Sequence, residues 1–408
     1  MMEGSAAVWQ GAALGGLFFW IVSSSYLNVT CRLRSFLQPW VIDHVVSGTS
    51  IVLQIQSYRL GILDAFFCGL SCVVSVSFYT AFLPLVFWSG HSKLARQLTL
   101  LIAFCDYVGN CVKDVVSAPR PASPPVRRLT ATKDEEDNAL EYGLPSSHTL
   151  NTVCFSGYIV HYVLTHTQIQ GAYVIVLGIF FASLLVAFIG LGRIYLGMHS
   201  LVDVIGGLLI GLGTLAFWLH IDEYLDSFLI SGRNVTSFWI ALSILLLFAY
   251  PTPELPTPSF EFHTAFNGVA LGIVAGVQQT YHQFHHEYVP RVFSPELAIT
   301  IPGFIGRMLV GIPTILIVKF CSKALAKWTL PVVSNTLGIP IKSTSYIPTL
   351  KGSFQGKKSD KLKQAYLQKL LSRYQVFDID TGIRFLQYAG LAWSVVDLVP
   401  SLFSYLNL

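Results

Sequence analysis

The sequence predicts an all-α protein, a polytopic bundle of transmembrane helices. Of its 408 residues, 53% are hydrophobic and only 12% are charged, whereas about a quarter of the residues are charged in an ordinary soluble protein. A mean hydropathy of +0.59 excludes a single water-soluble core, because too much apolar surface would remain exposed. The chain also contains several apolar runs that are long enough to cross a bilayer as helices. The formal net charge of +4 is too small to indicate a nucleic-acid partner.

Residues 1–59 are predicted to form an N-terminal interfacial segment. Residues 11–23 are apolar but short for a full span. A secretory signal would need a Lys or Arg before this run, and none is present. Farther along, Arg32, Arg34 and Arg59 are interspersed with aromatic residues. This composition suits a segment at the membrane surface.

Residues 60–250 are predicted to form the transmembrane core. The expected spans are about 60–88, 97–113, 149–166, 172–191 and 201–219, with a further apolar run at 238–250. The first span ends at Trp88, an aromatic residue expected at the membrane interface. The second ends at Lys113, because Pro119 and Pro121 would not be tolerated inside a helix. A hydrophilic loop at 121–144 and a polar stretch at 220–237 interrupt the apolar runs.

Residues 251–408 are predicted to add further C-terminal transmembrane helices, at about 264–280, 302–321 and 384–406. Between the last two lies a basic segment, 351–373, whose apolar residues have amphipathic spacing. We expect this segment to be a helix that lies on the bilayer, and a docking face is the alternative. The sequence does not determine the oligomeric state.

Three polar clusters stand at the edges of the core spans. They are Lys113 to Pro121, Pro145 to His148, and Arg193 to Asp203. Charged residues and histidines are costly next to lipid, so such clusters indicate a functional site. Each cluster alone has a plainer explanation: an edge Lys or Arg is more often an interfacial anchor, and a His and an Asp four residues apart could form a structural hydrogen bond. Their joint occurrence in order is what favours a site.

The order of the spans places the three clusters on one side of the membrane. The first cluster follows the second span, and the second immediately precedes the third. The third and fourth spans form a hairpin whose far turn is only residues 167–171, so the chain returns to the same side before Arg193. All three clusters therefore face one compartment.

The residue types in these clusters indicate a phosphate site. Lys113, Arg120 and Arg193 supply three positive charges, and a guanidinium group can hold phosphate oxygens in bidentate pairs. Phosphoryl transfer needs mainly positioning and stabilisation of charge on those oxygens. Ser146 and Ser147 open the third span, where the free N–H groups of a helix N-terminus can bind an anion.

Two histidines are candidates for the chemistry. His148 at the helix start could protonate a leaving alkoxide. His199 and Asp203 are four residues apart, so on a helix Asp203 can accept a hydrogen bond from one ring nitrogen of His199. The other nitrogen is then free to attack phosphorus. Asp203 would orient the ring in the same way as the Asp of a Ser-His-Asp triad orients its His. Water would hydrolyse the resulting phosphohistidine.

The clusters resemble the type 2 phosphatidic acid phosphatase superfamily of membrane enzymes, whose motifs are K-x6-R-P, P-S-G-H and S-R-x5-H-x3-D. The matching residues are Lys113, Arg120 and Pro121, then Pro145 to His148, then Gly192, Arg193, His199 and Asp203. The resemblance implies a core of about six helices and a reaction that needs no metal or other cofactor. It also implies phosphate binding by Lys113, Arg120, Ser146, Ser147 and Arg193, with His148 as general acid, His199 as nucleophile and Asp203 as its orienter.

Two positions depart from the general motifs. Ser147 stands where the superfamily has Gly, and Gly192 stands where it has Ser. The longer runs around Lys113, from Glu141 to His148, and from Gly192 to His199 are similar to sphingosine-1-phosphate (long-chain base phosphate) phosphatases. Length and span number fit the plant and fungal members of that group.

This narrower resemblance implies a metal-independent phosphatase for long-chain sphingoid base 1-phosphates that enter from the bilayer. It also implies a multi-pass protein of the endoplasmic reticulum with a lumenal site. A broader lipid phosphate phosphatase, for phosphatidate or a polyprenyl pyrophosphate, and an anion-binding transporter are the alternatives. With a lumenal site, we expect the sequon at Asn28 to be lumenal and the sequon at Asn234 to be cytosolic. Counting positive charges does not settle the orientation, since several arginines lie on the site's own side.

Two weaker signals remain. The acidic run at 134–137 could meet the ammonium of a sphingoid base, although a solvated loop is the plainer expectation. His282, His285, His286 and Glu287 cluster near a span end. We expect interfacial histidines there, with a metal pair as the alternative.

Overall fold

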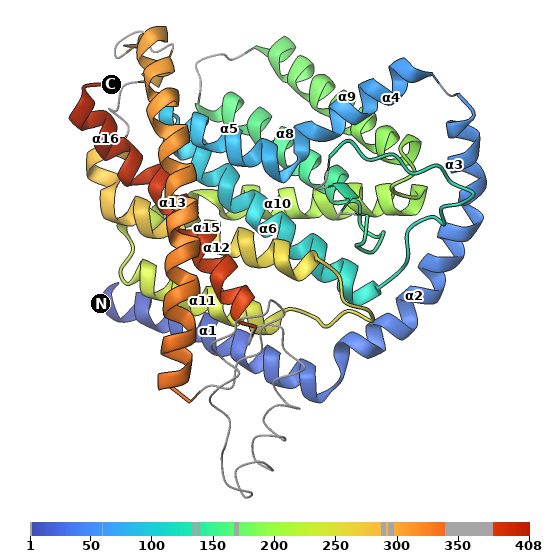
Figure 1. Ribbon diagram of the computed structural model, residues 1–408, viewed down its shortest axis with the longest axis horizontal. Helices are drawn as coiled ribbons and strands as arrows, with labels where there is room; N and C mark the ends of the chain where they lie inside the picture. Colours follow the sequence, from blue (N-terminus) through green and yellow to red (C-terminus); the bar gives the residue numbers. More distant parts are fainter. Residues whose placement is uncertain are drawn as a thin grey trace, which may run out of the picture. The chain divides into compact units, whose positions relative to one another are not determined.

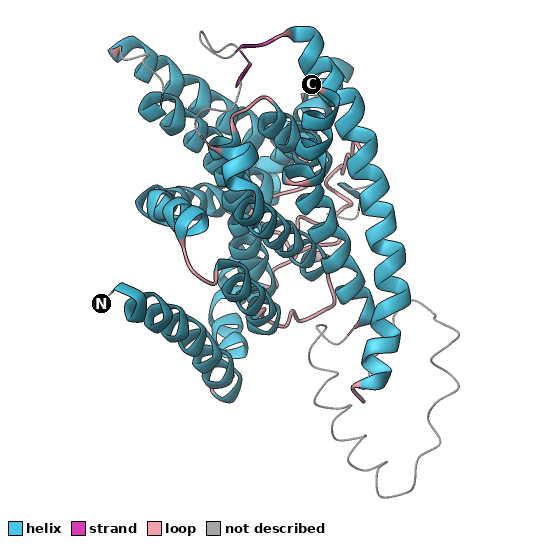
Figure 2. Ribbon diagram, turned by 90° about the vertical axis from the view of Figure 1, so that its left-hand side faces the viewer, coloured by secondary structure: helices cyan, strands magenta, loops and turns pink. Residues whose placement is uncertain are grey.

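The structure is a computed structural model that describes residues 2–58, 60–132, 135–136, 139–166, 171–286, 291–292, 298–338 and 378–408. Figure 2 shows that this part of the chain is almost entirely helical. The strands in these ranges, β1 (Arg291–Val292) and β2 (Ala298–Ile299), pair in parallel over two residues each. The prediction of an all-α fold is confirmed.

The chain divides into two compact units. The first, here called the core unit, comprises Ser23–Phe228 and Pro253–Ser259 and contains all three polar clusters. The second, here called the accessory unit, comprises Met1–Val22, Leu229–Thr252 and Phe260–Leu408. The three-region organisation expected from the sequence stays a prediction.

The described residues form a multi-pass membrane protein. Five helical segments are long and apolar enough to cross a bilayer: Ala172–Tyr195, Leu201–Ser231, Ser259–His285, Ile301–Thr336 and Ile379–Leu406. Two bent helix pairs could add one span each: Val8–Tyr26 with Val29–Gln56, and Gly61–Val74 with Val76–Trp88. Large apolar side chains such as Val176, Phe180 and Phe181 are exposed on the Ala172–Tyr195 helix, as a lipid-facing surface requires.

The core unit is a set of packed helices (Figure 1). In chain order they are α2 (Val29–Ser47), α3 (Thr49–Gln56), α4 (Gly61–Ser71), the 3₁₀ turn η1 (Cys72–Val74), α5 (Val76–Trp88), α6 (Ser92–Val116), α8 (Ser147–His166), α9 (Ala172–Tyr195) and α10 (Leu201–Ser231). Helix α6 packs against α2, α5 and α8, and α8 also packs against α9. Five consecutive residues of α6, Leu98 to Ile102, are buried, so neighbours cover every face of the helix at that level.

The expected spans at 97–113 and 149–166 are helices, but they differ from the other spans in composition. Helices α6 and α8 are 25 and 20 residues long, which is enough to cross a bilayer. Their polar side chains keep them out of the set of strongly apolar helices named above. In their buried stretches, such as Leu98 to Ile102 of α6 and His148 to Ser156 of α8, protein surrounds the side chains and shields polar groups from lipid.

Helix α2 secures the end of α6 that leads into the first polar cluster. The Arg34 guanidinium donates from Nη2 to the carbonyl of Asp114 at 2.8 Å and from Nε to the carbonyl of Val115 at 3.1 Å. Gln38 donates to the carbonyl of Ser117 at 2.9 Å. The last carbonyls of a helix have no partner inside it, so α2 satisfies them and fixes where the following loop starts.

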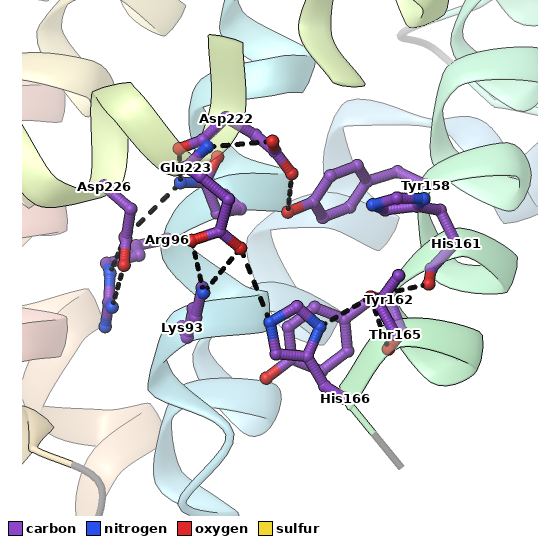
Figure 3. A network of polar contacts seen from close by, with 11 residues as sticks. Lys93, Arg96, Tyr158, His161, Tyr162, Thr165, His166, Asp222, Glu223 and Asp226 are labelled. Atoms are coloured by element: carbon purple, nitrogen blue, oxygen red, sulfur yellow. Dashed lines mark hydrogen bonds and ion pairs between the residues drawn. The ribbon is translucent and has the colours of Figure 1, made fainter. Parts of the chain in front are cut away.

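The opposite ends of α6, α8 and α10 meet in a second polar network (Figure 3). Arg96 and Asp226 form a buried bidentate ion pair with N–O distances of 2.5 and 2.7 Å. Tyr158 donates to a carboxylate oxygen of Asp222 at 3.2 Å, and Lys93 pairs with the exposed Glu223 at 2.8 Å. Each of the three helices thus carries one polar cluster at each end, which agrees with the predicted parity of the crossings.

The structure corrects the expected end of the span at 201–219. Helix α10 continues to Ser231, although the polar residues after 219 indicated a stop. The helix continues because Asp222 and Asp226 point into the bundle, where α6 and α8 supply hydrogen-bond donors. The basic segment 351–373 lies outside the described residues.

The accessory unit contains α1 (Met2–Tyr26) up to Val22, α11 (Val235–Ala249), α12 (Ser259–Thr280) from Phe260 on, the π-helical turn η2 (Tyr281–His285), α13 (Ile301–Thr336), α15 (Ile379–Val396) and α16 (Leu398–Leu406). Helices α12 and α15 approach closely through glycines spaced four residues apart. A Cβ at Gly268 would lie 2.4 Å from the carbonyl oxygen of Phe385, and one at Gly272 would lie 2.2 Å from that of Ala389. Small residues at this spacing let membrane helices pack backbone to backbone.

Candidate active site

The three polar clusters converge inside the core unit. Lys113 lies in the last turn of α6, and Arg120 lies in the loop that follows this helix. His148 lies in the first turn of α8. Arg193 lies near the end of α9, His199 lies in the link to α10, and Asp203 lies in the first turn of α10. Lys113, Arg193, His199 and Asp203 are each at most 1% exposed. So much buried charge requires partners within the protein or a ligand.

His199 is held between Arg120 and Asp203. Its Nε2 lies 2.8 Å from Nη1 of Arg120. Because a guanidinium group can only donate hydrogen bonds, Nε2 accepts, and the proton of the neutral ring is therefore on Nδ1. That nitrogen faces Asp203, with Nδ1 3.6 Å from Oδ2, which is longer than a hydrogen bond.

Asp203 is fixed by its own backbone contacts. Its Oδ2 accepts the backbone N–H of Ser200 at 2.8 Å, and its carbonyl oxygen accepts the N–H of Ser146 at 3.0 Å. The second contact ties the third cluster to the second. A Cβ at Gly143 would lie 2.9 Å from Oδ2 of Asp203, so a glycine is needed where the loop passes this carboxylate.

The electrostatics of the site keep His199 neutral. Burial lowers the pKa of His199 well below its ordinary value, and the positive charges of Arg120, Arg193 and Lys113 lower it further. A neutral imidazole with its proton on Nδ1 has a free electron pair on Nε2, which is the form a nucleophile needs.

The cations of the site are paired with two carboxylates of the hydrophilic loop. Lys113 Nζ donates to Glu141 Oε2, and Arg120 Nη2 lies 3.9 Å from the same oxygen. Arg193 Nη1 donates to Glu135 Oε1 at 2.7 Å. No pattern in the sequence predicted a role for Glu141. The signal that could have found it is its place in the run that leads to the Pro145–His148 cluster.

Glu135 corrects the expectation of a solvated acidic run. It is 3% exposed, and besides Arg193 it accepts from Ser71 Oγ at 2.5 Å and from the N–H of Ala131 at 2.7 Å. Burial alone would raise its pKa, but Arg193 and these hydrogen bonds bring the pKa below its ordinary value. Glu136 is exposed, as expected. Asp134 and Asp137 lie outside the described residues.

The start of α8 brings Ser146, Ser147 and His148 to the site. Ser146 is buried and its Oγ accepts from the Oγ1 of Thr149 at 3.1 Å and, weakly, from the N–H of Thr149 at 3.5 Å. Ser147 begins the helix and is half-buried. The buried Nε2 of His148 has no hydrogen-bond partner among the described residues, although the charges of Arg193, Lys113 and Arg120 act on the ring.

Packing explains the glycine at position 192. A Cβ there would lie 2.8 Å from Cδ1 of Phe67, whose ring is buried against Tyr195 at a centroid distance of 4.9 Å. A serine at this position would collide with that ring. The hydroxyl of the general motif is therefore replaced by an aromatic contact from α4.

The histidines near residue 282 lie in the accessory unit. His285 is buried, and its Nε2 lies 2.6 Å from the carbonyl oxygen of Val396, which makes this nitrogen the donor. Across the described residues, no three His, Cys, Asp or Glu side chains are close enough together to hold a metal ion. Glu287 is outside the described part of the chain.

A neutral imidazole, a carboxylate beside its second nitrogen and three buried cations can together hold a phosphate and transfer its phosphoryl group. In a multi-pass membrane protein, they define an integral-membrane phosphatase.

Comparisons with known proteins give the same class. The family model of the PAP2 superfamily matches residues 94–227. The chain is 67% identical to lipid phosphate phosphatase delta of Arabidopsis thaliana over 100% of this chain and 98% of that protein. It is 27% identical to a dihydrosphingosine 1-phosphate phosphatase of Schizosaccharomyces pombe, over 91% of each chain. It is 25% identical to sphingosine-1-phosphate phosphatase 1 of Rattus norvegicus, over 81% of this chain and 69% of that one. No solved structure matches.

The chain belongs to the PAP2 superfamily. It is a lipid phosphate phosphatase, a hydrolase of phosphoric monoesters.

Proposed function

We propose that the enzyme dephosphorylates long-chain sphingoid base 1-phosphates, such as sphingosine, dihydrosphingosine and phytosphingosine 1-phosphate, through a phosphohistidine at His199. Two kinds of observation support this substrate class. Relatives with sphingoid-phosphatase names align over most of the chain at 27% and 25% identity. The runs around Lys113, Glu141–His148 and Gly192–His199 are similar to that group.

The observation that carries the mechanism is the contact between Arg120 and His199. It sets the proton of His199 on Nδ1, toward Asp203, and leaves the electron pair on Nε2. When a phosphate arrives, the Arg120 guanidinium turns from Nε2 to the phosphate oxygens and uncovers the nucleophile. Lys113 and Arg193 exchange their carboxylate partners for the same oxygens, and Ser146 and Ser147 bind through N–H groups at the start of α8.

The reaction then has two steps. The Nε2 electron pair attacks phosphorus, the bond to the ester oxygen breaks, and that oxygen takes a proton from the imidazolium form of His148, which the negative charge of the bound phosphate stabilises. Asp203 stabilises the positive charge that develops on the His199 ring. In the second step His148 removes a proton from water, the hydroxide attacks phosphorus, and the P–N bond breaks to release inorganic phosphate. His148 is thus acid in the first step and base in the second.

The proposed location is the endoplasmic reticulum membrane, with the site facing the lumen. The lipid tail would enter laterally between helices, so that the phosphate reaches the site while the tail stays in the bilayer. A broader lipid phosphate phosphatase is the alternative, since the most similar relative named above carries only that general name.

A competition assay with the purified full-length enzyme tests the substrate class. Sphingosine 1-phosphate, phosphatidate and a polyprenyl pyrophosphate are offered at equal concentration in the same detergent micelles. The proposal predicts that kcat/KM for the sphingoid substrate exceeds the other two by at least about tenfold. Equal kcat/KM values for the three substrates, or a preference for phosphatidate, would contradict the proposed substrate class and favour a broader lipid phosphate phosphatase.

A further inference from the structure

The carboxylate of Glu141 lies among the cations of the site. Its Oε2 accepts from Lys113 and lies 3.9 Å from Nη2 of Arg120, and its Oε1 accepts from the Ser259 hydroxyl at 3.3 Å. Glu141 is only 7% exposed. A carboxylate is stable at such burial because these donors surround it.

Phosphate binding removes this arrangement. A phosphate that takes Lys113 and Arg120 as partners takes the two charges that neutralise Glu141, and it places its own negative charge beside the carboxylate. Like charges at such separation inside a protein oppose each other strongly. Glu141 would therefore oppose the binding of a substrate that carries a phosphate and no positive charge.

A sphingoid base 1-phosphate removes this conflict. Its ammonium group sits on the carbon next to the one that bears the phosphate ester, so it arrives at the edge of the phosphate site. We propose that Glu141 is the specificity residue that binds this ammonium, with Ser259 as the second donor to the carboxylate. The inference rests on the proposed substrate class and assigns its recognition to one side chain.

Glu135 differs from Glu141 and provides the matched control. Both of its oxygens are occupied: Arg193 and Ser71 donate to Oε1, and the Ala131 N–H donates to Oε2. Neither Ser71 nor the Ala131 N–H is a cation of the site, so a phosphate that takes Arg193 as its partner does not compete for these two contacts. Glu141 has no backbone N–H donor among the described residues, so its carboxylate can change partners.

The test measures kcat/KM for two substrates of equal chain length, sphingosine 1-phosphate and octadecyl phosphate, which lacks the amine. In Glu141→Gln the ratio of the two values is expected to fall at least about tenfold, the size of a lost hydrogen bond between charged groups. Glu141→Asp keeps the charge and is expected to retain most of the ratio. Glu135→Gln is expected to lower both values together and to leave the ratio within about threefold of wild type. An unchanged ratio in Glu141→Gln would overturn the inference.

A second measurement uses the wild-type enzyme and needs no variant to fold. O-Phosphoethanolamine and ethyl phosphate differ only in the ammonium group, and each is titrated as an inhibitor. The inference predicts that phosphoethanolamine inhibits at a concentration at least about tenfold lower. Equal inhibition would contradict it. If wild type shows no preference for the amine-bearing lipid, the proposed substrate fails; if that preference exists but survives in Glu141→Gln, only the role of Glu141 fails.

Discussion

In the proposed mechanism, the position of one proton on His199 determines which ring nitrogen attacks phosphorus. Arg120 fixes that proton on Nδ1, and Asp203 lies on the side where the proton stands. In the proposed mechanism a carboxylate at this place orients the ring and stabilises the charge that develops on it, whereas a neutral amide cannot stabilise that charge.

Asp203→Asn should therefore lower kcat by about 10²- to 10⁴-fold and leave the fold intact. Activity on a lipid phosphate and the thermal unfolding midpoint in detergent are the two readouts. Asp43→Asn, on an exposed position of α2, is the control and should keep full activity. A variant at 203 with near-normal kcat would show that the carboxylate is not the orienter.

The stability of the folded enzyme depends on pH through the carboxyl group of Glu135. Because its folded-state pKa lies below the ordinary value of 4.5, the folded state favours its charged form. Its contribution to stability is thus fully present above pH 4.5 and is lost as pH falls through the lower folded-state pKa.

Glu135→Gln should lower the thermal midpoint at neutral pH, and the difference from wild type should shrink as the pH falls below 4.5. Glu136→Gln, at the exposed neighbouring position, should show little difference at any pH. If the difference in thermal midpoint between Glu135→Gln and wild type stays constant as the pH falls below 4.5, the ion pair with Arg193 does not contribute to stability as described.

At the scale of the elements, helices α6, α8 and α10 are held at both ends by polar contacts. The end away from the site depends on the buried pair of Arg96 and Asp226, which joins α6 to α10. Breaking such a pair by removing one partner leaves a buried charge without compensation.

Arg96→Met should destabilise the enzyme by about 3–5 kcal/mol, whereas Lys93→Met, which breaks the more exposed pair with Glu223, should cost about 0–1 kcal/mol. Loss of activity in Arg96→Met should follow the unfolded fraction, since the pair is remote from the site. Denaturant unfolding in detergent measures both. Equal destabilisation by the two variants would contradict this account.

The sequence predicted which segments form helices better than it predicted which side chains contact one another. Apolar length identified the helices, and the spacing of His199 and Asp203 identified the two groups that face each other. It could not show that Glu135 pairs with Arg193 or that Glu141 pairs with Lys113, because loop residues have no periodicity that fixes where their side chains point. Nor could it show that Phe67 of α4 fills the space beside Gly192, since that contact joins residues more than a hundred positions apart.

At the scale of the whole molecule, chain connectivity relates the sequons to the site. Asn28 immediately precedes α2, whose Arg34 binds the end of α6 that leads into the site. Asn234 follows the far end of α10, which starts at the site. The two sequons are therefore expected on opposite sides of the membrane.

With a lumenal site, Asn28 should carry a glycan and Asn234 should not. The check is the gel mobility of single Asn→Gln variants before and after endoglycosidase treatment of microsomes. A glycan on Asn234 alone would reverse the orientation and place the site in the cytosol.

The proposed mechanism requires that His199 becomes covalently phosphorylated, and this intermediate can be trapped. The full-length enzyme is mixed with lipid phosphate labelled with ³²P, quenched in alkaline denaturant within milliseconds, and digested for peptide mapping. We expect an acid-labile, alkali-stable label on His199 in wild type and no label in His199→Asn. A label on another residue, or turnover that persists in His199→Asn, would contradict it.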